Sequence, residues 1–172
     1  DGYADVVVGS PYHDGAFTDG GQTLVFIGAP GTGTHFTTPY FTYTGTQTNE
    51  QQGFAVNTCG DVNGDGISDL VYGMPGYGGM GRIAVHHGGP DGLTLPATAV
   101  WDQQPDFADA EMGYAVSHAG DVNGDGFADV IVGLPGINVA RLYLGSSTGL
   151  QTAAAWSATG STVGGRFGAA GC

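Results

Sequence analysis

A nine-residue loop that occurs twice, almost unchanged, constrains this chain more than any other feature. The copies span residues 61–69 and 121–129 and lie 60 residues apart. Each places oxygen-bearing side chains at loop positions 1, 3, 5 and 9, and glycines at positions 4 and 6, where the backbone turns tightly. Calcium takes six to eight oxygen ligands, and this loop supplies most of such a shell. The sequence therefore predicts two calcium sites, with ligands Asp61, Asn63, Asp65, Ile67 (carbonyl) and Asp69, and Asp121, Asn123, Asp125, Phe127 (carbonyl) and Asp129.

The N-terminal residues match the second half of this loop. Residues 1–5 read Asp-Gly-Tyr-Ala-Asp, as residues 125–129 read Asp-Gly-Phe-Ala-Asp. They predict a partial site formed by Asp1, Tyr3 and Asp5, which residues upstream of position 1 would complete. Three copies at a period near 60 residues indicate a repeat protein in which every unit carries one metal loop.

Other calcium motifs share the opening of the loop but fit the rest of it poorly. An EF-hand needs a glutamate at position 12 and a helix on each side. Position 12 is Tyr72 or Val132, and both flanks are predicted strands. A solvated Asp/Asn/Gly turn without metal is the remaining alternative.

Short β-branched runs separated by Gly-rich turns predict four strands of about five residues in each unit. Four antiparallel strands in a repeating unit of this length are typical of a propeller blade. We therefore predict an all-β fold of about three blades. Their expected bounds are 1–49 (lacking its first strand), 50–109 and 110–163, followed by a closing strand at 164–172.

The units resemble the FG-GAP repeats of integrin α-subunit propellers and their bacterial relatives. The resemblance is carried by the Gly-Asp-Val-Asn-Gly-Asp-Gly loops at 60–66 and 120–126, by Phe167-Gly168, and by the turns at 9–11, 73–75 and 133–135. It implies structural calcium at the turn between the first two strands of a blade. It also implies an extracellular, secreted or cell-surface module for adhesion, or for recognition of a protein or glycan. The alternatives are a lectin with sugar sites between blades and an accessory propeller domain of a secreted enzyme.

Three blades are too few for an ordinary propeller ring, which has about four to eight. We expect either a piece of a longer chain or a homo-oligomer whose copies exchange terminal strands to close the ring. Exposed strand edges need partners, which favours both arrangements.

The composition excludes several other functions. The formal net charge is −13 with only three basic residues, so no basic surface for nucleic acid is available. No apolar run is long enough to insert into a membrane. The two cysteines, Cys59 and Cys172, are too few for a disulfide framework and are expected as small buried hydrophobic residues.

No catalytic constellation is visible, so we predict that the chain is not an enzyme. His86 and His87 are neighbours in a predicted strand and point to opposite faces, which suits surface or half-buried side chains. No Gly-x-Ser-x-Gly nucleophile motif occurs. Trp101 and Trp156 hold matching places in their units and are expected either to pack between blades or to form stacking platforms for sugars.

Overall fold

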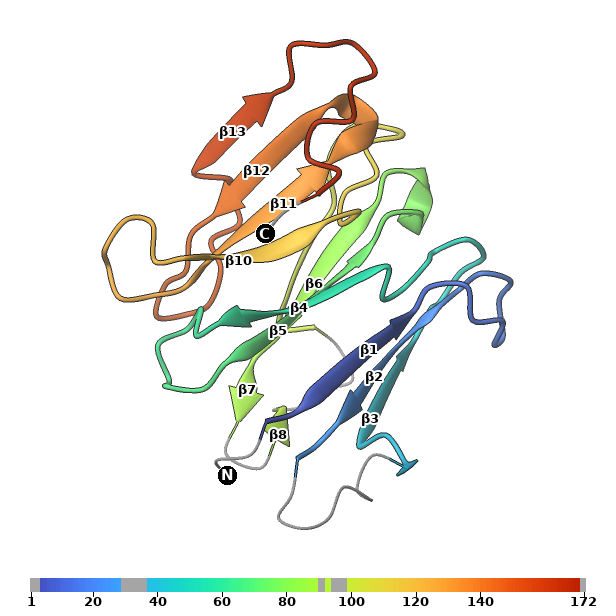
Figure 1. The fold of residues 1–172 in the computed structure, drawn as a ribbon, viewed down its shortest axis with the longest axis vertical. Helices are drawn as coiled ribbons and strands as arrows, with labels where there is room; N and C mark the ends of the chain where they lie inside the picture. Colours follow the sequence, from blue (N-terminus) through green and yellow to red (C-terminus); the bar gives the residue numbers. More distant parts are fainter. Residues whose placement is uncertain (1–3, 29–36, 90–91, 94–98, 171–172) are drawn as a thin grey trace.

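The structure is a computed structural model, and it describes residues 4–28, 37–89, 92–93 and 99–170. Three antiparallel sheets stand side by side in chain order, coloured from blue to red in Figure 1. The fold is all-β, and its sheets of three or four strands are those of propeller blades. No helix in these described ranges is long and apolar enough to cross a membrane.

The first sheet has the order β1-β2-β3, with β1 at Val6–Ser10, β2 at Gln22–Phe26 and β3 at Phe41–Thr44. The second has the order β4-β5-β6-β9, with β4 at Ala55–Gly60, β5 at Asp69–Met74, β6 at Arg82–His86 and β9 at Trp101–Gln103. A small hairpin of β7 (Gly88–Gly89) and β8 (Gly92–Leu93) lies between β6 and β9 in the chain. A 3-10 turn, η2, spans Tyr77–Gly79.

The third sheet has the order β10-β11-β12-β13, with β10 at Val116–Gly120, β11 at Asp129–Leu134, β12 at Val139–Tyr143 and β13 at Trp156–Thr159. Its 3-10 turn, η3, covers Pro135–Ile137. The second and third sheets repeat each other in detail. Each has the same register shift before its loop, between Thr58 and Gly60 and between His118 and Gly120.

The first strands of the second and third sheets start a few residues inside their units. They begin at Ala55 and Val116, in the units expected at 50–109 and 110–163. Gly53 and Gly113 adopt positive φ of 77° and 86° just before them, which extended strands do not allow. Residues 164–170, expected as part of a closing strand, lie in turns and bends.

A glycine contact repeats from sheet to sheet. Gly73 of β5 faces Gly113, at the entry to the third sheet, so closely that a Cβ on Gly73 would collide with the carbonyl oxygen of Gly113. Gly9 meets Gly53 in the same way, and Gly133 meets Gly168. Phe167-Gly168 therefore lies against the third sheet as the equivalent segments lie against the first and second.

Two apolar clusters fill the spaces between consecutive sheets. One lies mainly between the second and third sheets and includes Val71, Ile83, Val132, Leu134 and Tyr143. The other lies between the first and second sheets and is richer in aromatic rings, with Tyr43 and Tyr72 among its members.

His86 is fully buried between those two tyrosines, so the expectation of a surface or half-buried side chain is wrong. The Tyr43 hydroxyl lies 2.9 Å from Nδ1 of His86, and the Tyr72 hydroxyl lies 3.0 Å from Nε2. The tyrosines supply polar partners that adjacent positions in a strand could not reveal, because one of them comes from the first sheet. Burial lowers the pKa of His86 to about 4, and His87 adds to the shift.

Replacing Gly73 by alanine is expected to destabilise the fold by about 2–4 kcal/mol, because the new methyl group meets backbone that cannot move aside alone. Gly15→Ala is the matched control, since its Cβ would find only ordinary contacts at 3.6 Å. Chemical denaturation of both variants measures the difference. Equal stability of the two variants would contradict the close approach of the sheets.

The free energy of unfolding is expected to fall as pH falls from 6.5 toward about 4, because His86 binds a proton in the unfolded chain but not in the fold. The contribution reaches about 1.4 kcal/mol per pH unit. Denaturation of wild type and His86→Phe across this range measures it. The variant should lose that part of the slope, while the exposed His118→Asn keeps it. An unchanged slope in His86→Phe would contradict the burial of a neutral imidazole.

Candidate metal loops

The two complete loops adopt one conformation, held by the same hydrogen bonds. In the first, Asp61 accepts backbone N–H groups from Gly64 at 2.6 Å and Gly66 at 2.7 Å, while Asp65 accepts that of Ile67 at 2.9 Å. In the second, Asp121 accepts those of Gly124 and Gly126 at 2.7 and 2.8 Å, and Asp125 that of Phe127 at 3.0 Å. Asn63 and Asn123 each donate their side-chain amide to the aspartate two residues on.

The aspartate at loop position 9 accepts two backbone hydrogen bonds that the sequence pattern did not reveal. Asp69 accepts the backbone N–H of Val62 on one oxygen and that of Gly88 on the other, both at 2.8 Å. Asp129 bonds Val122 at 2.8 Å and Gly145 at 2.9 Å in the same way. This aspartate joins the loop to the turn that follows the third strand of its sheet. The glycine that follows the third strand, Gly88 or Gly145, is the sequence feature that could have revealed this contact.

The first sheet contains the equivalent of the bonds to Gly88 and Gly145. Asp5 accepts the backbone N–H of Gly28 at 2.8 Å, so it takes the place that Asp69 and Asp129 take in their sheets. The two other residues of the predicted partial site, Asp1 and Tyr3, lie outside the described residues.

The position-9 carboxylates are buried, and neither forms an ion pair with a described arginine. Asp69 is 1% exposed and Asp129 is fully buried. The two ion pairs within the described ranges join Arg82 to Asp102 and Arg166 to Glu111, away from the loops. Burial raises the pKa of Asp69 above its ordinary value, against the lowering by its two backbone hydrogen bonds.

Asp121 is fully exposed, and its pKa moves the other way. The backbone N–H of Gly126 lowers the pKa most, with those of Gly124 and Asp125 adding to it. The first aspartate of this loop is thus held as the anion that a cation would bind.

The loop oxygens suit a hard cation in kind, although the aspartates are turned toward backbone amides. Every candidate side-chain ligand is a carboxylate or an amide oxygen, and an ionised carboxylate that accepts one hydrogen bond keeps further lone pairs. Over the part of the chain that the structure describes, no three His, Cys, Asp or Glu side chains are grouped to hold a metal ion. The calcium assignment of both loops therefore stays a prediction.

The first loop also contacts the third sheet. The Asp61 carbonyl accepts the N–H of Ala128 at 2.8 Å, and the Val62 carbonyl accepts that of Ser146 at 3.1 Å. Val62 is fully buried there, whereas its counterpart Val122 is 54% exposed. One loop in the chain is covered by a following sheet, and the other is not.

The two tryptophans differ, although their places match in sequence. Trp101 is half-buried and packs edge-on against Tyr143, with ring centroids 5.3 Å apart, which agrees with packing between sheets. Trp156 is 49% exposed. Cys59 is buried as a free thiol, and Cys172 lies outside the described residues.

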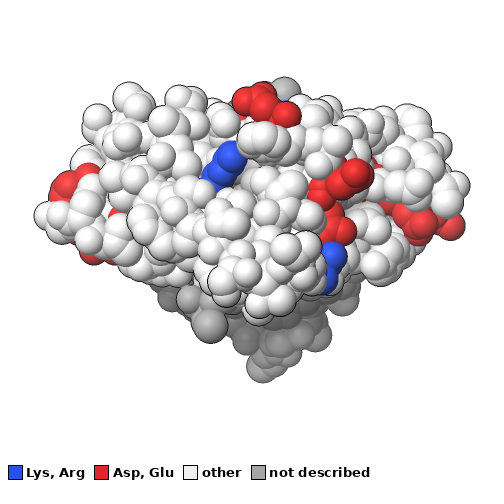
Figure 2. Space-filling model, turned by 90° about the horizontal axis from the view of Figure 1, so that it is seen from above, with Lys and Arg blue, Asp and Glu red and all other residues white. Residues whose placement is uncertain are grey.

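The face in Figure 2 carries several separate groups of acidic side chains and very few basic ones. This distribution agrees with the formal charge of −13 and offers no basic surface on that face.

Comparison with known proteins agrees with these features. A family model described as an FG-GAP-like repeat matches residues 61–132, which include both loops. Integrin alpha-5 of Xenopus laevis is 29% identical over 84% of this chain and 14% of its own length. Integrin alpha-PS3 of Drosophila melanogaster is 30% identical over 83% of this chain and 13% of its own length. Integrin alpha-IIb of Mus musculus is 29% identical over 83% of this chain and 14% of its own length.

The chain is therefore similar to the FG-GAP repeat propellers of integrin alpha subunits, as its motifs predict. It spans about one seventh of the length of these relatives.

Proposed function

We propose that this chain is an extracellular recognition or adhesion module whose blades are stabilised by calcium in the loops at 61–69 and 121–129. The similarity to integrin alpha subunits supports the class of function and a place at the cell surface or outside the cell. The ligand would be a protein or a glycan, and no observation favours an enzymatic role.

The observation that carries the calcium proposal is the pair of buried aspartates, Asp69 and Asp129, each at the end of an all-oxygen loop and neither in an ion pair with a described arginine. Burying an unpaired carboxylate costs several kcal/mol, and a bound cation offsets that cost. Calcium would act on the fold rather than in a reaction, because it fixes the turn between the first two strands of each sheet.

Calcium is expected to raise the melting temperature of the chain, and a chelator is expected to lower it. A ligand that binds only the folded state adds about 2.7 kcal/mol per site at a hundredfold excess over Kd. Calorimetric titration of Asp65→Ala and Asp125→Ala should each show one strong site where wild type shows two. Asp106→Ala, at an exposed loop position, is the control and should keep both. Identical melting of calcium-loaded and chelated protein would contradict the proposal.

We further propose that the end sheets pair with additional blades, from a second copy or from a longer chain. Side chains that are covered inside the array have exposed counterparts at its ends. Val62, in the loop of the second sheet, is fully buried against the third sheet, whereas its counterpart Val122 in the third sheet is 54% exposed. Val6 and Val8 of β1 are both 42% exposed on the first sheet. Phe167 adds another exposed apolar side chain, at 42%.

Light scattering of this chain is expected to show a dimer or larger assembly at micromolar concentration, because the exposed apolar side chains of both end sheets favour association. Val122→Asp is expected to weaken the assembly by placing a charge on one end face. Thr148→Asp is the control, because Thr148 is an exposed residue between β12 and β13 of the same sheet, and this variant should leave the assembly unchanged. A stable folded monomer would show that copies of the chain do not pair.

A further inference from the structure

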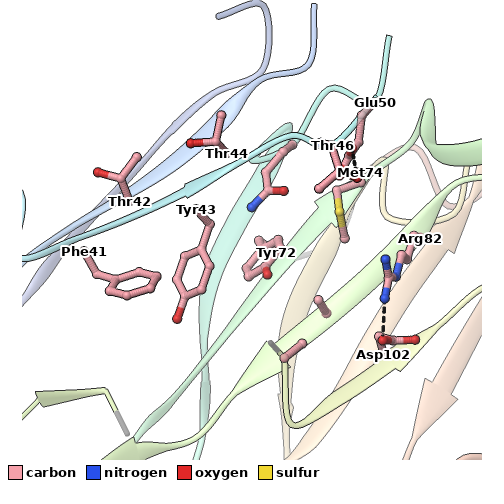
Figure 3. A pocket seen from close by; sticks show the side chains of 13 residues that line it. Phe41, Thr42, Tyr43, Thr44, Thr46, Glu50, Tyr72, Met74, Arg82 and Asp102 are labelled. Carbon is pink, nitrogen blue, oxygen red and sulfur yellow. Dashed lines mark hydrogen bonds and ion pairs between the residues drawn. The ribbon is translucent and has the colours of Figure 1, made fainter. Parts of the chain in front are cut away.

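The space between the first and second sheets contains a hollow of about 360 Å³, lined by aromatic, aliphatic and charged side chains and shown in Figure 3. It is bordered by β3, β5, β6, β9 and the segment that leads into β4. Its lining includes Phe41, Tyr43, Glu50, Tyr72, Arg82 and Asp102. Its volume lies within the range of small-molecule sites, about 300–1,000 Å³.

The equivalent space between the second and third sheets is lined differently. Glu50 and Gln52 precede the second sheet where Ala110 and Met112 precede the third, 60 residues on. All four are buried, but the second pair belongs to an apolar cluster that also holds Val132 and Leu134.

The strand residues that line the two spaces also differ, and those of the first space are again the more polar. Tyr72 corresponds to Val132 and Met74 to Leu134 by the repeat. Arg82 pairs with Met74 as Val139 pairs with Leu134, so an arginine stands where the third sheet has valine. Blade packing alone is satisfied by the apolar set. The charged side chains at the first interface are therefore not a general requirement of packing between these sheets.

The charged groups of the hollow are held in place. Arg82 donates from Nη2 to Oδ2 of Asp102, and its guanidinium lies 4.7 Å from the centre of the Tyr77 ring. Nε of Arg82 is buried and has no hydrogen-bond partner among the described residues. Glu50 is 2% exposed, and its Oε2 accepts three hydrogen bonds, from Thr46 N, Thr46 Oγ1 and Gln47 N.

The aromatic wall offers ring surface rather than hydroxyl groups. Phe41 and Tyr43 stand 4.2 Å apart by ring centroid, and Tyr72 follows 5.6 Å from Tyr43. Both tyrosine hydroxyls are engaged by His86. Phe41 is the more accessible ring of the three, since it is only partly buried.

We infer that this hollow is a binding site for a neutral saccharide unit. Its ligand needs an apolar face for the rings, together with donors for the carboxylates and acceptors for the guanidinium, and a sugar has all three. An anion would meet two carboxylates against one guanidinium in a chain of net charge −13. A cation would meet the guanidinium of Arg82, and a wholly apolar ligand would leave three charged groups desolvated.

The inference deepens the proposed recognition function by naming the class of ligand and its place. The proposed sugar site lies at the interface of the first two sheets, whereas the sequence offered the two tryptophans as stacking platforms. Since the hollow lies away from both metal loops, it depends on calcium only through the stability of the fold.

Saturation-transfer NMR on the calcium-loaded full chain tests the inference. The probes are glucose, galactose, mannose, N-acetylglucosamine and lactose at millimolar concentration, with glucuronate and arginine methyl ester as the charged comparisons. At least one neutral sugar is expected to bind, more strongly than either charged probe. Arg82→Met and Glu50→Gln should each weaken it by about tenfold or more.

Arg141→Met is the matched control, because Arg141 occupies a half-buried strand position in the third sheet. It should keep full binding. A second variant, Glu50→Ala with Gln52→Met, installs the residues of the apolar interface and should abolish binding. Folding of every variant is checked by its thermal melt.

Three results would overturn the inference: no neutral sugar binds the folded wild type, binding persists unchanged in Arg82→Met, or arginine methyl ester binds more strongly than every neutral sugar. Calcium-dependent melting reports separately on the proposed function. Failure of sugar binding with intact calcium stabilisation would therefore reject this site and leave the module's proposed role standing.

Discussion

The architecture depends on a buried carboxylate that joins two turns of the same sheet. Asp69 and Asp129 each bond one backbone N–H in the loop before their strand and one in the turn after the third strand. Asp5 makes the second of these bonds in the first sheet. A charged acceptor bonds backbone amides more strongly than a neutral one. The bonds therefore hold two turns together at one end of a sheet, but they leave buried negative charge, which supports the proposed cation at the loop.

Repetition made most of the fold predictable from the sequence. The identical spacing of the loops gave the period, and short β-branched runs gave the number and order of strands in each sheet. The ends of strands were less predictable, because Gly53 and Gly113 adopt positive φ inside runs that otherwise read as extended. The sequence shows only that a glycine is present. That a Cβ does not fit there follows from the position of the neighbouring sheet, which the sequence does not give.

Contacts between sheets were the least predictable part. His86 reads as a surface residue within its strand, and only the approach of Tyr43 from the first sheet makes its burial favourable. The hollow beside it joins segments about 60 residues apart in the chain, from Phe41 to Asp102. Comparing matching positions of the repeats does contain a signal. One interface has Glu50, Gln52 and Arg82 where the next has Ala110, Met112 and Val139, and this difference supports the proposed site.

Hydrogen exchange at single amides tests the central role of the buried aspartate most directly. In wild type, the amides of Gly88 and Gly145 should be protected to a similar degree, because each is bonded to its own aspartate. In Asp129→Ala, protection should fall at Gly145 and at Val122 while Gly88 and Val62 keep most of theirs. Unprotected Gly88 and Gly145 amides in wild type, or unchanged protection of Gly145 in the variant, would contradict the account.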